Sequence, residues 1–184
     1  MLASDPALRE ALFRALSACL GLTRNTAAAS SLIRPAYTEP ENPLRPPRDR
    51  NVIYMDLQQE DVPAERCLAI LPAADPDSTA SRGVTLRTVQ AFRLVLVCYG
   101  PDAEDHAHRI RTRLFLDGPG QPRAILRAAG IFPVPHPPQP VLLHEPENSL
   151  WRTRADCTVS LRVTDEQTVS LPAVTAAPAV SIRI

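Results

Sequence analysis

Two histidines beside a carboxylate come closest to a reactive group in this sequence. His106 and His108 follow Asp105, and an imidazole beside a carboxylate is the usual way to build a general base or a metal site. The surrounding residues have helical periodicity, and residues two apart on a helix point roughly 200° apart in projection, so these imidazoles cannot chelate one ion. The spacing therefore favours the ordinary polarity of a solvated helix.

The other histidines, the cysteines and the glycines also lack the spacing of a reactive site. His136 lies between prolines and His144 precedes Glu145 in a Pro-rich stretch, and neither has the context of a known catalytic signature. The cysteines are scattered singly, with no Cys-x-x-Cys pair, which predicts buried free thiols. They are Cys19, Cys67, Cys98 and Cys157. The six glycines form no phosphate-binding loop.

The only tryptophan lies in an arginine-rich stretch. Trp151 is followed by Arg152 and Arg154, a composition that can form an interface hot spot or a platform on which bases stack. A single tryptophan that opens a strand is more often a core or edge-capping residue. Tyr99, at the end of another predicted strand, can equally pack its ring and hydrogen-bond its hydroxyl. Neither residue requires a ligand.

The bulk composition predicts one soluble domain without a charged partner. A chain of 184 residues and 20.1 kDa buries roughly 70% of its unfolded surface, enough for one core. The 20 basic and 20 acidic residues cancel, which disfavours nonspecific binding to DNA or anionic membranes. Neither a signal peptide nor an apolar run of about 18 residues is present, so we expect synthesis in the cytoplasm and no membrane span.

A helix is predicted over residues 5–21. Asp5 suits the N-cap, Pro6 the first turn and Gly21 the left-handed position past the end. The apolar stripe repeats at spacings of four, three and four. It comprises Leu8, Leu12, Ala15 and Cys19.

The 20 prolines are about twice the usual share and predict long extended or irregular stretches. Residues 34–50 contain five of them and form a surface connection, long enough to wrap a neighbour or to line a functional surface. Residues 133–140 are predicted to be polyproline-like. Residues 169–184 favour extended structure, which Pro172 and Pro178 confine to a sheet edge or an arm.

Four strands are predicted, at residues 52–57, 67–71, 84–99 and 155–163. In the third, apolar residues occupy both faces, which predicts a sheet covered on both sides. One face carries Phe92, Leu94, Leu96 and Cys98, and the other Val95, Val97 and Tyr99. The fourth alternates strictly from Ala155 to Val163, which predicts one solvent-facing side.

A second helix follows the third strand, at residues 102–114. Acidic residues lie in its first turn and arginines in its last, as the helix dipole favours. Its apolar stripe predicts that it lies across the sheet it has just left. The stripe comprises Ala103, Ala107, Ile110 and Leu114. A short helix is predicted from Pro122 to Ala129, ending at Gly130.

These elements predict an α+β fold, an α/β sandwich of about four to six mainly antiparallel or mixed strands with one or two helices on one face. We expect a single domain over residues 1–184. It divides into an N-terminal helix (residues 1–22), the Pro-rich connection (34–50), an α/β core (51–165) and an extended C-terminal strand or arm (166–184).

The order of these motifs resembles the phage neck terminator or tail terminator proteins over nearly the whole chain. After the first helix come Leu-Ile-Arg-Pro-Ala-Tyr (residues 32–37), an Asn-Pro turn (42–43) and a strand. Next are Phe-Arg-Leu-Val-Leu-Val-Cys-Tyr-Gly-Pro (92–101) and a helix carrying Arg-Ile-Arg-Thr-Arg-Leu-Phe (109–115). Leu-Arg-Ala-Ala-Gly (126–130), a Pro-rich passage and Trp-Arg-Thr-Arg-Ala-Asp (151–156) follow. The loop at residues 58–85 does not match that pattern, and residues 144–150 match it only loosely.

The resemblance implies a structural protein of the phage virion that assembles into a ring, sixfold, at the head-proximal end of the tail. Such a ring terminates the tail tube or sheath, joins it to the neck and head-completion proteins, and leaves a lumen through which DNA passes. It implies neither enzymatic activity nor a cofactor or metal. The alternatives are another head-tail connector or tail-completion subunit, or a small ligand-binding or hydrolytic α/β domain that uses Asp105, His106 or Trp151.

For a ring protein, the functional site is a subunit interface. Aromatic and arginine residues are favoured at interface hot spots, and extended apolar arms can pair with a neighbour's sheet edge. The candidate interface residues are Tyr37, Trp151, Arg152, Val180 and Ile182.

Overall fold

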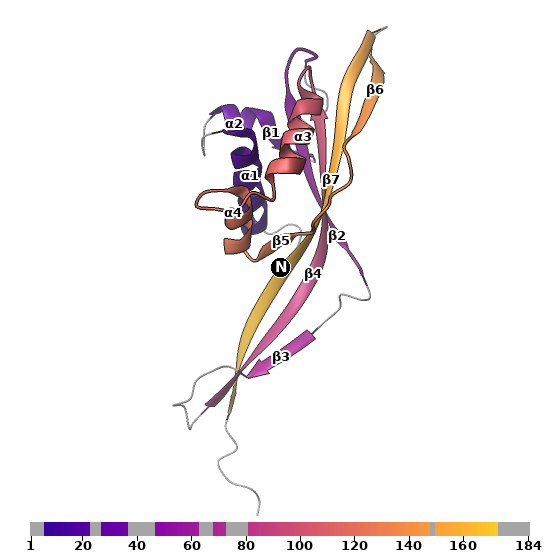
Figure 1. Cartoon of the computed structure of the whole chain (residues 1–184). Coiled ribbons are helices and arrows are strands. Elements are labelled where there is room, and N and C mark those ends of the chain that lie inside the picture. Colours follow the sequence, from indigo (N-terminus) through magenta and orange to yellow (C-terminus); the bar gives the residue numbers. More distant parts are fainter. Residues whose placement is uncertain are drawn as a thin grey trace, which may run out of the picture.

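The computed structural model describes residues 6–22, 27–36, 47–62, 68–72, 81–147 and 150–172. These form one sheet with helices on one side of it (Figure 1). The helices are α1 (Pro6–Leu20), α2 (Ala27–Leu32), α3 (Ala103–Arg113) and α4 (Pro122–Ala128). The strands are β1 (Ile33–Pro35), β2 (Val52–Glu60), β3 (Leu68–Pro72), β4 (Ser81–Tyr99), β5 (Ile131–Pro133), β6 (Val141–Glu147) and β7 (Leu150–Pro172).

Two long antiparallel strands, β4 and β7, form the spine of the sheet. They pair from Ser81 opposite Pro172 to Tyr99 opposite Arg154. On the far edge of β4 lie β2 and β3, and on the far edge of β7 lie β5 and β6. Among the described strands, only β1, which pairs with β2, is parallel to its neighbour. The predicted α+β fold with a mixed sheet is confirmed. The described sheet has seven strands, because each spine strand carries two partners and β1 adds a seventh strand at the edge of β2.

The alternation predicted for the spine strands sets the core. The side of the sheet that faces the helices, here the inner face, carries fully buried residues from both strands. From β4 these are Phe92, Leu94, Leu96 and Cys98, and from β7 they are Ala155, Cys157, Val159, Leu161 and Val163. Burying such side chains contributes about 1.5–3 kcal/mol for each large aliphatic or aromatic residue. The core therefore follows from the period-2 pattern of the sequence.

The helices bury the stripes that their spacing predicts. In α1 the four-three-four stripe is buried, Pro6 is the first residue, and Gly21 has φ +72°. The Leu22 N–H donates to the Ser17 carbonyl at 2.9 Å, a bond typical of a left-handed helix end. The second predicted helix, α3, lies on β4 and β7, while α1 packs against α3 and α4. Within the described residues, no helix has the length and apolarity that a membrane span requires.

The opposite face of the sheet, here the outer face, differs from the prediction. Val95, Val97 and Tyr99 on β4 are only half-buried, and Figure 1 shows no described helix on that side. The prediction of a sheet covered on both faces is therefore wrong for the described part of the chain. Around Tyr99 the cover comes from neighbouring strands, since Tyr54 of β2 and Arg152 and Arg154 of β7 lie against its ring. On β7 the predicted solvent-facing side is confirmed.

The Pro-rich segment after β5 departs from polyproline geometry. His136 has φ +59°, whereas polyproline II requires about −75°. The bend turns the Pro137 and Pro138 carbonyls toward α3, where Arg111 Nε donates to them at 3.2 and 3.1 Å. The segment is therefore tied to α3 by a side-chain hydrogen bond, which proline spacing alone does not predict.

The two predicted connecting arms are described only in part. The first residues of the 34–50 connection form strand β1, residues 37–46 with Tyr37 lie outside the described residues, and the rest makes a turn before β2. In the C-terminal part, β7 continues to Pro172. Residues 173–184, with Val180 and Ile182, lie outside the described residues.

Three cysteines are buried free thiols, as their isolated positions predict. Burial raises the pKa of Cys19 to about 12 and that of Cys157 to about 11, and it raises the pKa of Cys98 as well. Because the thiolate is the reactive form, we expect none of the three to be alkylated by iodoacetamide at neutral pH until the chain is unfolded. Peptide mass mapping of folded and guanidinium-unfolded samples checks this. Rapid alkylation of any of them in the folded protein would contradict it.

Replacing His136 tests the left-handed bend. A non-glycine residue in this conformation costs about 1–2 kcal/mol, and a β-branched residue suffers more. His136→Gly is expected to leave the free energy of unfolding within about 0.5 kcal/mol of wild type, because relieved strain offsets the greater freedom of the unfolded chain. His136→Val is expected to lower it by about 1 kcal/mol or more. Equal urea midpoints for the two variants would show that the bend carries no strain.

Candidate assembly surface

A hairpin of β6 and β7 extends past the end of the spine. Strand β6 pairs with the start of β7, from Val141 opposite Asp156 to Glu147 opposite Leu150. Strand β4 ends opposite Arg154, so the first residues of β7 have only β6 as a neighbour. Figure 1 shows this hairpin projecting away from the helices.

The hairpin exposes a cluster of large apolar side chains, here the apolar tip. Trp151 is 72% exposed, Leu150 60% and Val141 56%, and Leu142 and Leu143 are also exposed. Five of the seven exposed large hydrophobic residues in the described chain thus belong to one hairpin. The pairing register places Trp151 and Leu142 on the inner face of the hairpin and Val141, Leu143 and Leu150 on its outer face. A single exposed apolar residue needs no explanation, but several on one short hairpin indicate a contact surface. Of the possibilities that the sequence left open for Trp151, the exposure of its side chain excludes core packing.

Strand β6 also has an open edge. It pairs with β7 on one side, and no described strand pairs with the other. Residues 141–143 along that edge are Val-Leu-Leu, and the charged Glu145 and Glu147 come only farther on. An edge without charge, proline or bulge offers unpaired N–H and C=O groups to another strand. The apolar half of β6 is therefore suited to strand addition.

Behind the tip, an arginine and carboxylate cluster holds the hairpin to the spine. The Arg154 guanidinium donates twice to Asp156, at 2.7 Å each, and once to Glu145 at 2.6 Å. Bidentate pairs of this kind fix geometry as well as charge. The hydrogen bonds to Asp156 raise the pKa of Arg154, so the guanidinium keeps its positive charge.

Arg152 belongs to the same cluster and is buried. Its guanidinium carbon lies 4.6 Å from the centre of the Tyr99 ring, and Nη1 lies 3.4 Å from Glu147 Oε2. Cation–π contacts of this geometry are favourable when desolvated. Burial raises the pKa of Tyr99, so the ring stays neutral. Since strand side chains alternate, Arg152 points to the outer face and Trp151 to the other. Arg152 thus stabilises the hairpin from the face opposite the exposed Trp151 side chain.

A turn at the end of β4 positions α3 beside the hairpin. Gly100 has φ +112°, and a Cβ there would meet Asn51 Oδ1 at 2.4 Å and the Arg50 carbonyl oxygen at 2.8 Å. Asn51 Nδ2 donates to Asp102 Oδ2 at 2.7 Å, and Asn51 Oδ1 accepts from the Asp102 N–H at 3.0 Å. The chain before β2 is therefore locked to the turn before α3.

Arg48 connects the same segment before β2 to the apolar tip. Its Nη2 donates to the Trp151 carbonyl at 2.5 Å, and its Nε lies 3.8 Å from Glu147. A shallow cavity of about 260 Å³ lies at this junction. It is lined by Arg48, Gly100, Pro101, Trp151, Arg152 and Thr153. The backbone of Trp151 is thus fixed, although its ring is exposed.

The two histidines of α3 do not form a reactive pair. His106 Nδ1 is buried without a hydrogen-bond partner in the described chain, and burial lowers the pKa of His106, against the opposing effect of Asp102 and Asp105. His108 Nε2 lies 3.8 Å from Glu104 Oε1, one helical turn away. Among the described residues, no group of three or more His, Cys, Asp or Glu side chains is placed to hold a metal ion.

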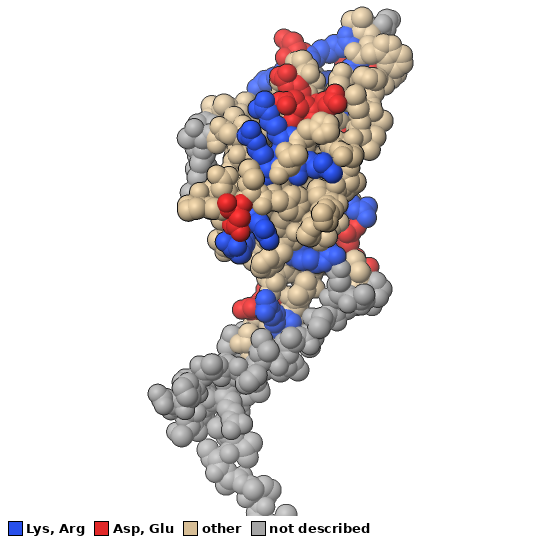
Figure 2. All heavy atoms as spheres, in the orientation of Figure 1, with Lys and Arg blue, Asp and Glu red and all other residues tan. Residues whose placement is uncertain are grey.

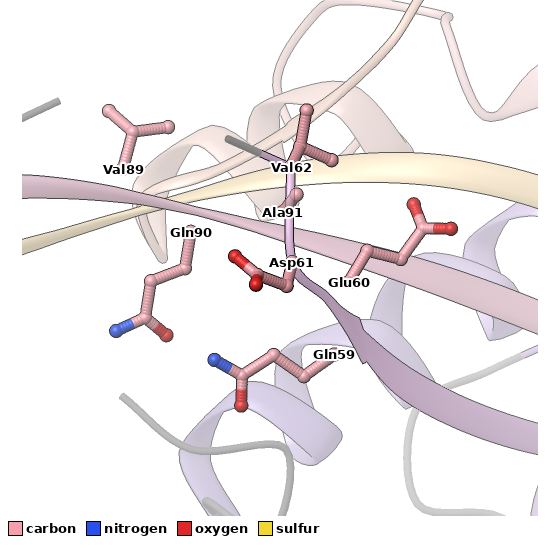
Figure 3. Close-up of a pocket in the computed structure, with 7 residues that line it drawn as sticks. All are labelled: Gln59, Glu60, Asp61, Val62, Val89, Gln90 and Ala91. Carbon is pink, nitrogen blue, oxygen red and sulfur yellow. The ribbon is translucent and has the colours of Figure 1, made fainter. Parts of the chain in front are cut away.

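A small hollow lies along the edge of β4, in the gap between the residues that pair with β2 and those that pair with β3 (Figure 3). It has a volume of about 110 Å³ and is lined by Gln59, Glu60, Asp61, Val62, Val89, Gln90 and Ala91. Glu60 is engaged in an ion pair with Arg93. The lining contains no hydroxyl, thiol or imidazole group, so the hollow brings no nucleophile to its carboxylates. We interpret it as a gap in strand pairing.

The structure places two of the five candidate interface residues. Trp151 is on the exposed surface and Arg152 is buried behind it, while Tyr37, Val180 and Ile182 lie outside the described residues. The interface role of all five stays a prediction. Sequence reasoning missed the rest of the tip, although the Val-Leu-Leu run at residues 141–143 between Pro140 and His144 was an available signal. Nothing local in the sequence pointed to Arg48 or Asn51.

Comparison with known proteins adds the family. The profile of the family described as "Phage neck terminator protein" matches residues 8–183. A search of curated proteins finds no match. Since the matched region covers nearly the whole chain, the resemblance seen in the order of motifs is confirmed, and the protein belongs to the phage neck terminator family as a structural component of the virion neck.

Proposed function

We propose that this neck protein assembles with copies of itself into a closed ring, six copies in number, at the head-proximal end of the tail. The ring terminates the tail tube or sheath and joins it to neck and head-completion proteins. Each copy is a single domain, made in the cytoplasm of the host bacterium. The observation that carries the proposal is the apolar tip, a braced hairpin that exposes Trp151 and four aliphatic residues beyond the core.

The position of the tip favours a ring over a two-fold dimer. It lies at one end of β7, and Pro172 lies at the other, so a contact between the two ends joins unlike surfaces. Such heterologous contacts generate rings when the rotation closes, whereas two-fold dimers join a surface to itself. The braced hairpin is suited to this role because a preorganised contact surface loses little conformational entropy on binding.

The charge distribution supports a lumen through which DNA moves freely. The chain carries 20 basic and 20 acidic residues, and on the face shown in Figure 2 the two signs are interspersed. A strongly basic lumen would hold the passing duplex through contacts to its phosphates, each of which adds to affinity. A balanced surface avoids that retention. The proposed role is structural, without enzymatic activity or cofactor.

Two measurements test the proposal. The first is electron microscopy of phage particles that lack this protein, in which a terminator predicts unattached heads and overlong tails. Tails of normal length that fail to join heads would place the protein at a connector tier instead. The second is light scattering coupled to size exclusion. A chain that stays monomeric at all concentrations and never caps tail tubes would overturn the proposal.

A further inference from the structure

We infer that residues 173–184 of one copy add as a strand to the open edge of β6 in a neighbouring copy and pack against the exposed aliphatic side chains along that edge. The inference rests on the proposed function only in requiring that the copies assemble. It names which part of each copy binds which part of the next.

The tip needs a cover that also supplies backbone hydrogen bonds. Val141 and Leu143 are exposed on one face of β6 and Leu142 on the other, next to an edge that no described strand pairs with. A side-by-side helix would bury the side chains but leave the edge N–H and C=O groups without partners. An added strand satisfies both, because main-chain bonds give affinity while alternate side chains pack against the neighbouring strand.

Residues 173–184 have the pattern of such a strand. Val180, Ile182 and Ile184 alternate with Ser181 and Arg183, so an extended backbone would place the three β-branched residues on one face. The apolar face matches the aliphatic side chains of the β6 edge. No apolar alternation of this kind occurs in the Pro-rich residues 37–46.

The length of the spine makes this contact intermolecular. Asp156, which pairs with Val141 of β6, precedes Pro172 by 16 residues of one continuous strand. At about 3.3 Å per residue that separation is about 53 Å. The 12 residues 173–184 span at most about 43 Å when fully extended. They cannot reach β6 of their own chain, so they can cover only the tip of another copy.

The same arrangement allows the contact to repeat from one copy to the next. Each copy carries an acceptor edge next to the start of β7, and the proposed donor segment follows Pro172 at its other end. One copy can therefore give its segment to the next while it receives one from the previous copy. A repeated contact of this kind closes into a ring when the rotation per copy allows it.

Cysteine crosslinking in the full-length chain tests the pairing directly. Leu143→Cys and Ile182→Cys are made separately in a Cys67→Ser background, mixed, and treated with a short bismaleimide. The buried thiols of Cys19, Cys98 and Cys157 are expected not to react. The inference predicts a covalent dimer only in the mixture, and a ladder of multimers from the double variant. The matched control pairs Ile182→Cys with Leu116→Cys, an exposed leucine outside the hairpin, and should give no dimer.

Trp151 reports the same event by fluorescence, since it is the only tryptophan in the chain. Assembly is expected to shift its emission to the blue and to protect it from acrylamide. Ile182→Asp replaces an apolar contact of the proposed strand with a charge, so protection should need at least about tenfold more protein. Ser181→Asp adds the same charge on the opposite face of the proposed strand and should have a much smaller effect.

Three results would overturn the inference. Assembly with a protected Trp151, but without the crosslink from 143 to 182 and without an effect of Ile182→Asp, would overturn it while leaving the ring intact. Protection of Trp151 that does not depend on concentration would show that the chain covers its own tip. A chain that remains monomeric would overturn the proposed function and the inference together.

Discussion

Gly100→Ala is expected to lower the free energy of unfolding by about 3 kcal/mol or more, the largest stability effect of any substitution considered. The new Cβ would lie 2.4 Å from Asn51 Oδ1 and 2.8 Å from both the Arg50 carbonyl oxygen and Asn51 Cα. Two of these three atoms are backbone, so rotation of a side chain cannot relieve the clash. Forced overpacking costs about 1–3 kcal/mol, and φ +112° adds the strain of a conformation that L side chains rarely adopt.

The clash also breaks the lock between β2 and α3. To make room, Asn51 must leave Asp102, whose N–H and carboxylate it binds at 3.0 and 2.7 Å. Each such hydrogen bond contributes about 0.5–1.5 kcal/mol. Urea unfolding followed by circular dichroism measures the total. For a chain of this length, 3 kcal/mol corresponds to a fall in Tm of about 6–12 °C.

Gly21→Ala is the matched control, because it shares the left-handed φ but not the crowding. Gly21 has φ +72° and nothing lies within 4 Å of the position that a Cβ would take. Its replacement should cost only the conformational penalty of about 1–2 kcal/mol. If the two variants were equally stable, the close approach of residues 50–51 to the turn would not be a feature of the folded protein.

The sequence predicts the spine and the core because their signals are local. Alternation in β4 and β7 and the four-three-four stripe of α1 depend only on residues within one element, so the buried set follows from the residue pattern alone. Turn chemistry is equally local, which is why Gly21, Gly100 and Gly130 lie at element ends with φ of +72°, +112° and +70°.

The candidate site is harder to predict because its parts come from distant segments. Arg48 binds the backbone of Trp151, and Asn51 binds Asp102, although nothing near either residue in the sequence indicates a partner. The exposure of Trp151 has the same origin. It depends on β4 ending opposite Arg154, so that the hairpin continues without a neighbour, and a strand pattern does not show where its partner stops.

The outer face of the sheet shows a third limit on what can be predicted from the sequence. Apolar residues at Val95, Val97 and Tyr99 predicted a second covering layer, but the half-buried state is reached through long neighbouring side chains. Arg152 and Arg154 lie over the Tyr99 ring at 4.6 and 5.9 Å, and Tyr54 packs edge-on to it at 6.1 Å. Arginine stems cover apolar surface while their charged ends meet carboxylates. Hydrophobic patterning does not distinguish this shielding from a covering helix.

Trp151→Thr is expected to weaken self-assembly by about 30-fold or more while leaving the folded subunit intact. The side chain is 72% exposed, so its removal takes little buried surface from the monomer, and threonine keeps the strand preference of the position. The backbone of residue 151 retains its bond from Arg48. Exposed aromatic residues on a contact surface are typical hot spots, and truncation of one costs about 2 kcal/mol or more.

The matched control for this substitution is Leu116→Thr, which removes an exposed apolar side chain (49% exposed) from the segment after α3, away from the hairpin. Light scattering against protein concentration gives the assembly midpoint of each variant, and urea unfolding gives its stability. The apolar tip predicts a shifted midpoint for Trp151→Thr alone, with unfolding free energies within about 0.5 kcal/mol of wild type for both. An unchanged midpoint for Trp151→Thr would mean that the copies associate through a different surface. Equal shifts in both variants would mean that any loss of exposed apolar area weakens association, so that the contact is nonspecific. Only a loss confined to the hairpin identifies the tip as the surface through which this neck protein assembles.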